Sequence, residues 1–363
     1  MSDHRPSVRR IARAGQARTA RQPLIPPRRR IGERIALIPP GRHSCAPSSP
    51  LLAERLLIHS FIWLPATLAA AALQAWRTAV QRRVGQSLSV NAAGLVRYLY
   101  GLPFALLLAL GYHAIVHGGA LPMPGGRLLM FSAAAGLAQI IATNLLLMAF
   151  REHNFVVGTA YSKTEAAQGA LLSWALLGER LGLLAWAGIG AGVAGVMILS
   201  TGGRRMSAAD FLRALGHPAA RYGIASGLFF AFTAVGVRRA TMEVPTTDTI
   251  SAALIVLAVT VTLQTLMQGA WLIWREPLQV RAVFTSWRIS GQVGLLSSLG
   301  SACWFTGFAS APVALVRIVG QVEVLFTLSF AHFYLREPLR RSEVAGLALV
   351  VTGVVLALVG AWH

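Results

Sequence analysis

From Ile58 onward, long apolar stretches alternate with short polar loops along the chain. A helix of about 20 apolar residues crosses the roughly 30 Å hydrocarbon layer of a membrane. The stretches lack the alternation of strands, and a backbone in lipid must satisfy its own hydrogen bonds. The pattern predicts an all-α, polytopic membrane protein with ten transmembrane helices, at residues 58–76, 98–116, 128–150, 155–177, 181–201, 222–237, 250–271, 289–309, 312–335 and 344–361.

The composition agrees with this fold class. Of the 363 residues, 55% are hydrophobic and 13% are charged, whereas an ordinary soluble domain is about a quarter charged. These values argue against a soluble enzyme. The only cysteines, Cys45 and Cys303, form neither a disulfide framework nor a zinc motif, so we expect no metal and no cofactor.

The net charge of +20 would by itself suggest a nucleic-acid partner. Residues 1–57, however, hold 12 arginines against three acidic residues and have no aromatic side chain. We expect this segment to be a disordered Arg/Pro-rich tail that touches anionic lipid. A misassigned translation start is an alternative, and a nucleic-acid-binding arm is a weaker one because no aromatic residues separate the arginines.

Two halves of the chain resemble each other when the sequence is shifted by 158 residues. The shift places Gly136 on Gly294, Phe150 on Phe308 and Glu165 on Glu323, without gaps. Each half contains five predicted helices, and a chain that crosses five times begins its second half on the opposite face. The sequence therefore predicts two inverted five-helix repeats, at 58–201 and 222–363, joined by a linker at 202–221. Inverted repeats are typical of secondary transporters.

Two copies of a turn motif resemble a known family. They are Gly178-Glu179-Arg180-Leu181 and Arg336-Glu337-Pro338-Leu339, each followed by a glycine-rich apolar helix. Together with "LVRYLYGLPFALL", which contains Arg97, they resemble the drug/metabolite transporter superfamily, in particular its EamA-type ten-helix exporters. The resemblance covers about residues 58–361. It implies two five-helix repeats, export of a small metabolite or drug, and both termini inside the cell.

Few charged residues fall within the predicted helices, and a charge at the centre of a bilayer costs at least about 2.5–3.5 kcal/mol. Glu165 and Glu323 occupy equivalent repeat positions. Both are expected either to face a central cavity, contacting substrate or carrying protons, or to be held in ion pairs such as Lys163 with Glu323. The candidate substrate-binding or coupling residues are Glu165, Glu323, Lys163, Arg317, Arg97, Tyr161 and Gln321. We predict no catalytic and no metal-binding residue.

The basic groups on the helices around Lys163 and Arg317 weakly resemble those of organic-anion branches of the superfamily. That resemblance implies a substrate with a carboxylate or phosphate, including a zwitterionic amino acid. The chain has no phosphate-binding GxxxxGK[ST] motif, so transport should be coupled to protons or to substrate exchange.

The predicted function is therefore secondary transport of a small molecule across the bacterial inner membrane. A structural or regulatory membrane protein is the alternative, and a membrane-embedded enzyme is a weaker one. The predicted partners are a small-molecule substrate and the lipid bilayer, and no nucleic acid. Glycines at 188, 192 and 195 favour close packing within the chain and leave a homodimer open. Membrane orientation stays open because predicted loops place four arginines on the side of the termini and 14 on the other.

Overall fold

The computed structural model of the chain describes residues 62–84, 87–118, 122–151, 161–200, 216–326, 329 and 341–362. The chain divides into two units, Met1–Ser48 and Ser49–His363, and every described residue belongs to the second. The predicted tail and most of the predicted linker lie outside the described residues, as does Glu337.

All regular elements in these described ranges are α-helices, which confirms the all-α, polytopic fold class. Four helical stretches among the described residues are long and apolar enough to cross a membrane: Val90–Val116, which comprises α3 and α4, Gly126–Ala149, Pro218–Thr241 and Thr249–Arg275. The described helices are α2 Trp63–Val84, α3 Val90–Leu99, α4 Leu102–Val116, α5 Gly126–Arg151, α7 Glu165–Leu177, α8 Leu183–Ser200, α10 Pro218–Thr241, α11 Thr249–Arg275, α12 Pro277–Thr285, α13 Trp287–Ser310, α14 Val313–Gly320 and α16 Arg341–Trp362.

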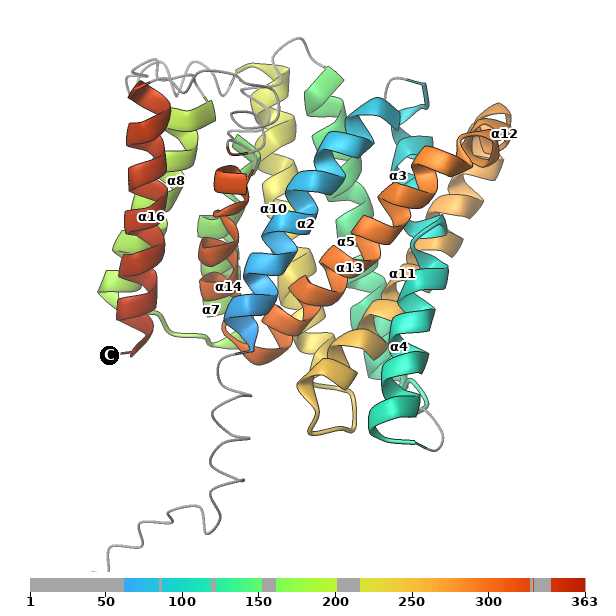
Figure 1. Ribbon diagram of the computed structural model, residues 1–363, viewed down its shortest axis with the longest axis horizontal. Coiled ribbons are helices and arrows are strands. Elements are labelled where there is room, and N and C mark those ends of the chain that lie inside the picture. Colours follow the sequence, from blue (N-terminus) through green and yellow to red (C-terminus); the bar gives the residue numbers. More distant parts are fainter. Residues whose placement is uncertain are drawn as a thin grey trace, which may run out of the picture. The chain divides into compact units, whose positions relative to one another are not determined.

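The first helices of the two repeats run in opposite directions (Figure 1). Helix α2 begins at Trp63, at the lower end of the view, where α16 ends at Trp362. Helix α10, which opens the second repeat, begins at the upper end and runs downward. We call the end that holds Trp63 and Trp362 the terminal end, and the opposite end, which holds α12, the α12 end. The repeats are therefore inverted, as the sequence predicts.

The predicted helices 155–177 and 312–335 are interrupted at equivalent positions. In the first repeat a turn at Lys163–Thr164 precedes α7, and in the second a turn at Gln321–Val322 follows α14. The two turns coincide under the 158-residue shift. Glu165 and Glu323 are each the first residue of the helical segment that follows, where the helix dipole stabilises a negative charge. Broken helices of this kind form the binding sites of many secondary transporters.

Other helix boundaries also differ from the prediction. Helix α2 runs past its predicted end at Trp76 to Val84, which places Arg77 inside a helix instead of a loop. The second predicted helix begins earlier, at Val90, and breaks at Tyr100–Gly101, shortly before Pro103. Proline cannot donate the backbone hydrogen bond that would continue the helix through this point. Helix α12 replaces what the sequence suggested was a loop.

Glycines bring α8 and α16 into close contact. A Cβ atom added to Gly188 would lie 2.6 Å from the carbonyl oxygen of Gly353, and one added to Gly195 would lie 2.6 Å from that of Gly346. Close packing within the chain therefore accounts for these two glycines. The largest hydrophobic core lies elsewhere, among α5, α10, α11 and α13, and holds the helices around the cavity described next.

Candidate functional site

A cavity of about 250 Å³ lies at the centre of the bundle, where both broken helices meet. Its aromatic lining comes from Phe230 of α10 and from Trp304, Phe305 and Phe308 of α13. Helices α2, α3, α5, α7, α10 and α14 and the two breaks supply a polar lining unusual for a membrane interior: Gln74, Arg77, Thr78, Arg97, Gln139, Ser162, Lys163, Glu165, Thr233, Arg317 and Glu323.

Two ion pairs cross the cavity between the repeats. Lys163 Nζ of the first repeat lies 2.7 Å from Glu323 Oε2 of the second. Arg317 Nη1 of the second repeat lies 3.4 Å from Glu165 Oε1 of the first. All four side chains are largely buried. The two glutamates are thus equivalent under the repeat shift, although their cationic partners are not.

Further hydrogen bonds fix the Lys163–Glu323 pair to the neighbouring helices. Gln74 Nε2 of α2 donates to Glu323 Oε2 at 2.7 Å, and Gln74 Oε1 accepts from Trp304 Nε1 at 3.0 Å. A chain of polar contacts therefore runs from Trp304 through Gln74 and Glu323 to Lys163. Because these residues come from both repeats, movement of one repeat against the other would rearrange the contacts.

Arg317 is held by both charge and aromatic contacts. Its guanidinium carbon lies 5.4 Å from the ring centre of Trp304 and 5.1 Å from that of Phe308, and Nη2 donates to the carbonyl of Phe230 at 2.9 Å. Cation–π contacts of a desolvated arginine are worth about 2 kcal/mol. The Arg317 head group is therefore well fixed at the aromatic side of the cavity.

Arg77 and Arg97 differ from the other two cations. Within the described part of the chain, neither forms an ion pair with a carboxylate. The Nε atoms of both, like that of Arg317, are buried without a hydrogen-bond partner there. Arg97 Nη1 donates only to Thr143 Oγ1, at 3.3 Å, and its guanidinium carbon lies 5.6 Å from the Tyr98 ring centre. Four basic and two acidic side chains line the cavity, so its lining carries a net positive charge.

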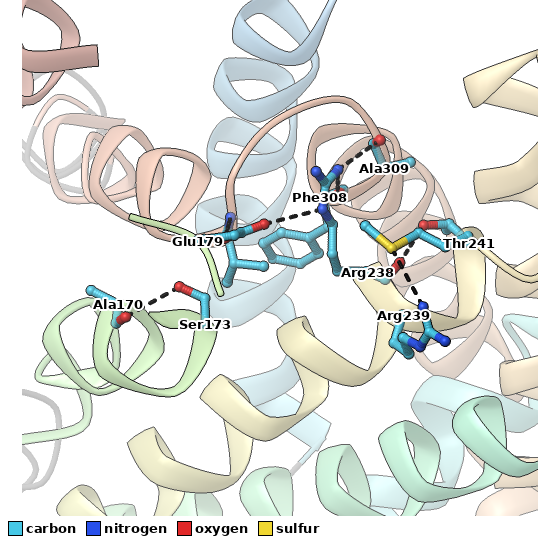
Figure 2. A network of polar contacts seen from close by, with 10 residues as sticks. Ala170, Ser173, Glu179, Arg238, Arg239, Thr241, Phe308 and Ala309 are labelled. Atoms are coloured by element: carbon cyan, nitrogen blue, oxygen red, sulfur yellow. Dashed lines mark hydrogen bonds and ion pairs between the residues drawn. The ribbon is translucent and has the colours of Figure 1, made fainter. Parts of the chain in front are cut away.

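A second polar network lies at the terminal end, where α10 and α13 end (Figure 1, Figure 2). Arg238, near the end of α10, donates from Nε to Glu179 Oε1 at 3.2 Å and from Nη1 to the carbonyls of Phe308 and Ala309, both at 2.8 Å. The other carboxylate oxygen of Glu179 accepts from the backbone N–H of Val313 at 3.0 Å.

The network joins the two repeats, because Glu179 belongs to the first and its partners belong to the second. The sequence placed Glu179 in a turn motif. In the structure Glu179 and Arg238 form a largely buried pair, with 12% and 17% of their side chains exposed.

The structure brings five of the seven predicted site residues into the cavity lining: Glu165, Glu323, Lys163, Arg317 and Arg97. Tyr161 and Gln321 are buried close by but are not among the lining residues. Gln321 instead packs on α8, because a Cβ atom added to Gly192 would collide with its Oε1.

Sequence reasoning missed Arg77 because it ended the first helix at Trp76, and it did not single out Gln74 within that helix. The spacing of polar residues indicated a polar helix face that continues past Trp76. The three- and four-residue intervals of one face separate Gln74, Arg77, Thr78 and Gln81.

A solved structure, described as a crystal structure of a protein, resembles this fold with a TM-score of 0.59 at 17% sequence identity. The match covers 83% of this chain and 98% of the solved chain. Comparison with curated proteins finds no match.

The EamA-like transporter family matches two segments, residues 61–201 and 218–359. These segments contain the two inverted repeats, and the family consists of membrane transporters of the drug/metabolite type rather than enzymes. With both repeats matched, the chain belongs to the EamA-like transporter family.

Proposed function

We propose that the chain is a secondary transporter that exports a small metabolite bearing a carboxylate or a phosphate group. Arg77 and Arg97 carry this proposal, because they face the cavity without an ion-pairing carboxylate among the described residues. An unpaired cation in a membrane interior is costly, and an anionic group of the substrate would complete its hydrogen bonds. A zwitterionic amino acid also fits, because Glu165 and Glu323 line the same cavity.

Alternating access would proceed by rocking of one repeat against the other. The terminal end is held closed by the Arg238–Glu179 network, whereas the cavity lining reaches toward the α12 end through Thr78, Leu146 and Leu199. Opening of the terminal end would break contacts that join the repeats. The crossed pairs Lys163–Glu323 and Arg317–Glu165 would rearrange in the same movement.

Coupling would come from protons or from substrate exchange through the two glutamates. Each glutamate begins a helical segment and contacts a cation of the other repeat, so movement of one repeat against the other would change the surroundings of both carboxylates. The chain would act in the bacterial inner membrane. Tyr161 and Gln321 would support the broken helices from behind the cavity.

The test is flux through proteoliposomes that contain the purified full chain. The screen would offer amino acids, phosphorylated metabolites and cationic dyes as separate substrate classes, with and without a pH gradient. We expect saturable movement of an anionic or zwitterionic solute, and loss of the response to pH in Glu165→Gln or Glu323→Gln. Movement of cationic dyes alone would contradict the substrate class. Chemical change of a solute, or no movement of any, would overturn transport itself.

A further inference from the structure

Helix α12 breaks the symmetry of the two repeats. Shifted back by 158 residues, it falls on the connection before α5, where residues 122–125 have no helical structure. In Figure 1, α12 is seen nearly end-on, whereas its neighbours α11 and α13 run obliquely between the lower and upper ends of the view. It therefore lies across the direction of the spanning helices, at one end of the bundle. The repeat architecture does not require this element, so it needs its own explanation.

Large apolar side chains project outward along this segment. Leu278 of α12 is 89% exposed and Phe284 is 58% exposed. On either side, Trp274 at the end of α11 is 69% exposed and Trp287 at the start of α13 is 58% exposed. Tryptophan in particular collects at the level of lipid head groups, and a helix that lies in this plane buries its apolar side chains among the acyl chains.

Three arginines accompany these apolar residues. Arg275, Arg281 and Arg288 are all exposed, and none of them forms an ion pair within the described residues. Arg275 instead lies over two indoles, 4.6 Å from the ring centre of Trp274 and 5.4 Å from that of Trp271. Its position beside the rings leaves its guanidinium donors available to an outside acceptor.

The one carboxylate in this segment faces the other way. Glu276 Oε1 accepts a hydrogen bond of 2.6 Å from Asn91 of α3. Residues 271–289 therefore present positive charge outward.

We propose that this interfacial surface, formed by α12 with Trp271, Trp274, Arg275, Trp287 and Arg288, binds the head groups of anionic phospholipids. Guanidinium groups form paired hydrogen bonds with phosphate oxygens. Basic residues near an anionic leaflet are also attracted to its surface charge. The tryptophans and Leu278 would occupy the acyl-chain side of the same lipids. Among possible occupants, an anionic lipid is the one that matches both the charge and the apolar side chains.

Bound lipid would act next to the cavity. The Tyr100 hydroxyl donates to the carbonyl of Val283 at 3.1 Å, and Gln279 Oε1 accepts from the backbone N–H of Ser89 at 3.2 Å. Both contacts fix α12 to α3 or to its ends, and α3 carries Arg97. Lipid bound at this surface would therefore stabilise the position of α3 and, with it, that of Arg97 in the cavity.

The experiment counts lipids retained by the full chain. The protein is taken from nanodiscs of equal parts phosphatidylglycerol and phosphatidylcholine, and lipids bound to it are measured by native mass spectrometry. The test variant combines Arg275→Gln, Arg281→Gln and Arg288→Gln. The matched control combines Arg127→Gln, Arg180→Gln and Arg221→Gln, which removes the same charge from exposed arginines elsewhere.

We expect the test variant to retain at least a few-fold less phosphatidylglycerol than wild type, and the control to retain it fully. Phosphatidylcholine binding should be the same in all three proteins. Equal loss in both variants would mean that net charge alone attracts the lipid, and would overturn the site. A change of oligomeric state in the test variant with lipid binding intact would mean that the surface is an interface between copies, and would also overturn it.

Discussion

Lys163 and Glu323 form an ion pair of 2.7 Å that joins the first repeat to the second at the centre of the bundle. Arg317 and Glu165 form the reciprocal pair at 3.4 Å. Both glutamates begin a helical segment at a break that the repeats share. The two carboxylates thus line the cavity and are also ion-paired across it, and their contact with substrate or protons stays a prediction.

The first prediction concerns the Lys163–Glu323 pair. Removing one partner leaves an uncompensated buried charge, which destabilises a protein by about 3–5 kcal/mol. We expect Glu323→Gln to lower the thermal unfolding temperature of the detergent-solubilised protein clearly. The double variant Lys163→Met with Glu323→Gln should recover part of that loss. Additive losses in the double variant would show that the pair is not coupled.

Glu243 provides the matched control for this prediction. It pairs at 2.9 Å with Arg239, four residues earlier, and 42% of the arginine side chain and 16% of the glutamate side chain are exposed. Pairs at this spacing with the cation in solvent contribute about 0.3–0.5 kcal/mol. Glu243→Gln should therefore leave the unfolding temperature almost unchanged.

The second prediction tests the substrate contact of Arg77 and Arg97. A hydrogen bond to a charged group is worth about 1.5–3 kcal/mol, equivalent to roughly 10- to 150-fold in affinity. We expect Arg77→Gln and Arg97→Gln each to raise the KM for the anionic solute identified by flux by roughly that factor. Arg221→Gln, an exposed arginine of α10 outside the cavity, should leave the KM unchanged. A similar KM in all three variants would remove both arginines from the binding site.

The sequence predicted the repeat, the fold class and five of the cavity residues because these depend on residue type and on period. It also indicated that Lys163 and Glu323 could pair. It did not predict the breaks at 163–164 and 321–322, since the residues there, Lys-Thr and Gln-Val, contain no proline or glycine. These breaks are stabilised by tertiary contacts between the repeats, which no local pattern reveals.

The predicted helix boundaries were wrong where a helix contains charged residues. Arg77 lay directly after the predicted end of a helix, because hydropathy falls in the polar segment that ends at Val84. Low hydropathy is also the reason that α12 was predicted as a loop, since its sequence begins with proline and contains an arginine. In both places the chain continues as a helix because one face is packed against the bundle. Burial of a single helix face depends on tertiary packing, which the mean hydropathy of a segment does not indicate.

The third prediction tests closure of the terminal end. Arg238 donates one hydrogen bond to Glu179 of the other repeat and two to carbonyls near the end of α13 in its own repeat, whereas the adjacent Arg239 donates to Met242 of its own repeat (Figure 2). A cysteine placed at Thr233, which lines the cavity, would report access from each side. We expect Arg238→Gln to make this cysteine react with a membrane-impermeant thiol reagent added at the terminal end. In Arg239→Gln, reaction from that end should stay as slow as in the parent. Equal reaction in the two variants would mean that the network is not the barrier.

The fourth prediction concerns pH and the loop before α11. Burial alone would raise the pKa of Asp248, but hydrogen bonds from His117, Tyr112 and the backbone N–H groups of Ser251 and Ile250 hold that pKa below its ordinary value. The stabilisation is therefore complete above the ordinary aspartate pKa of about 3.9, and it is lost as the pH falls below it. We expect the unfolding temperature of wild type to fall more steeply below pH 4 than that of Asp248→Asn. Parallel curves would contradict this assignment.

The last prediction separates two glycines by their surroundings. A Cβ atom at position 353 would lie 2.6 Å from the carbonyl oxygen of Gly188 and as close to the backbone nitrogen of Gly192, whereas one at Gly190 would meet nothing within 4 Å. Because backbone cannot move aside as a side chain can, we expect Gly353→Ala to push α16 from α8 and to destabilise the protein by about 1–3 kcal/mol. Gly190→Ala should be neutral or stabilising by up to about 1 kcal/mol, since alanine favours the helix. Thermal unfolding of both variants in the same detergent measures the difference, and equal stability would mean that α8 and α16 tolerate separation. Such tolerance would also weaken the rocking proposal, because α8 and α16 come from opposite repeats and their contact couples the two.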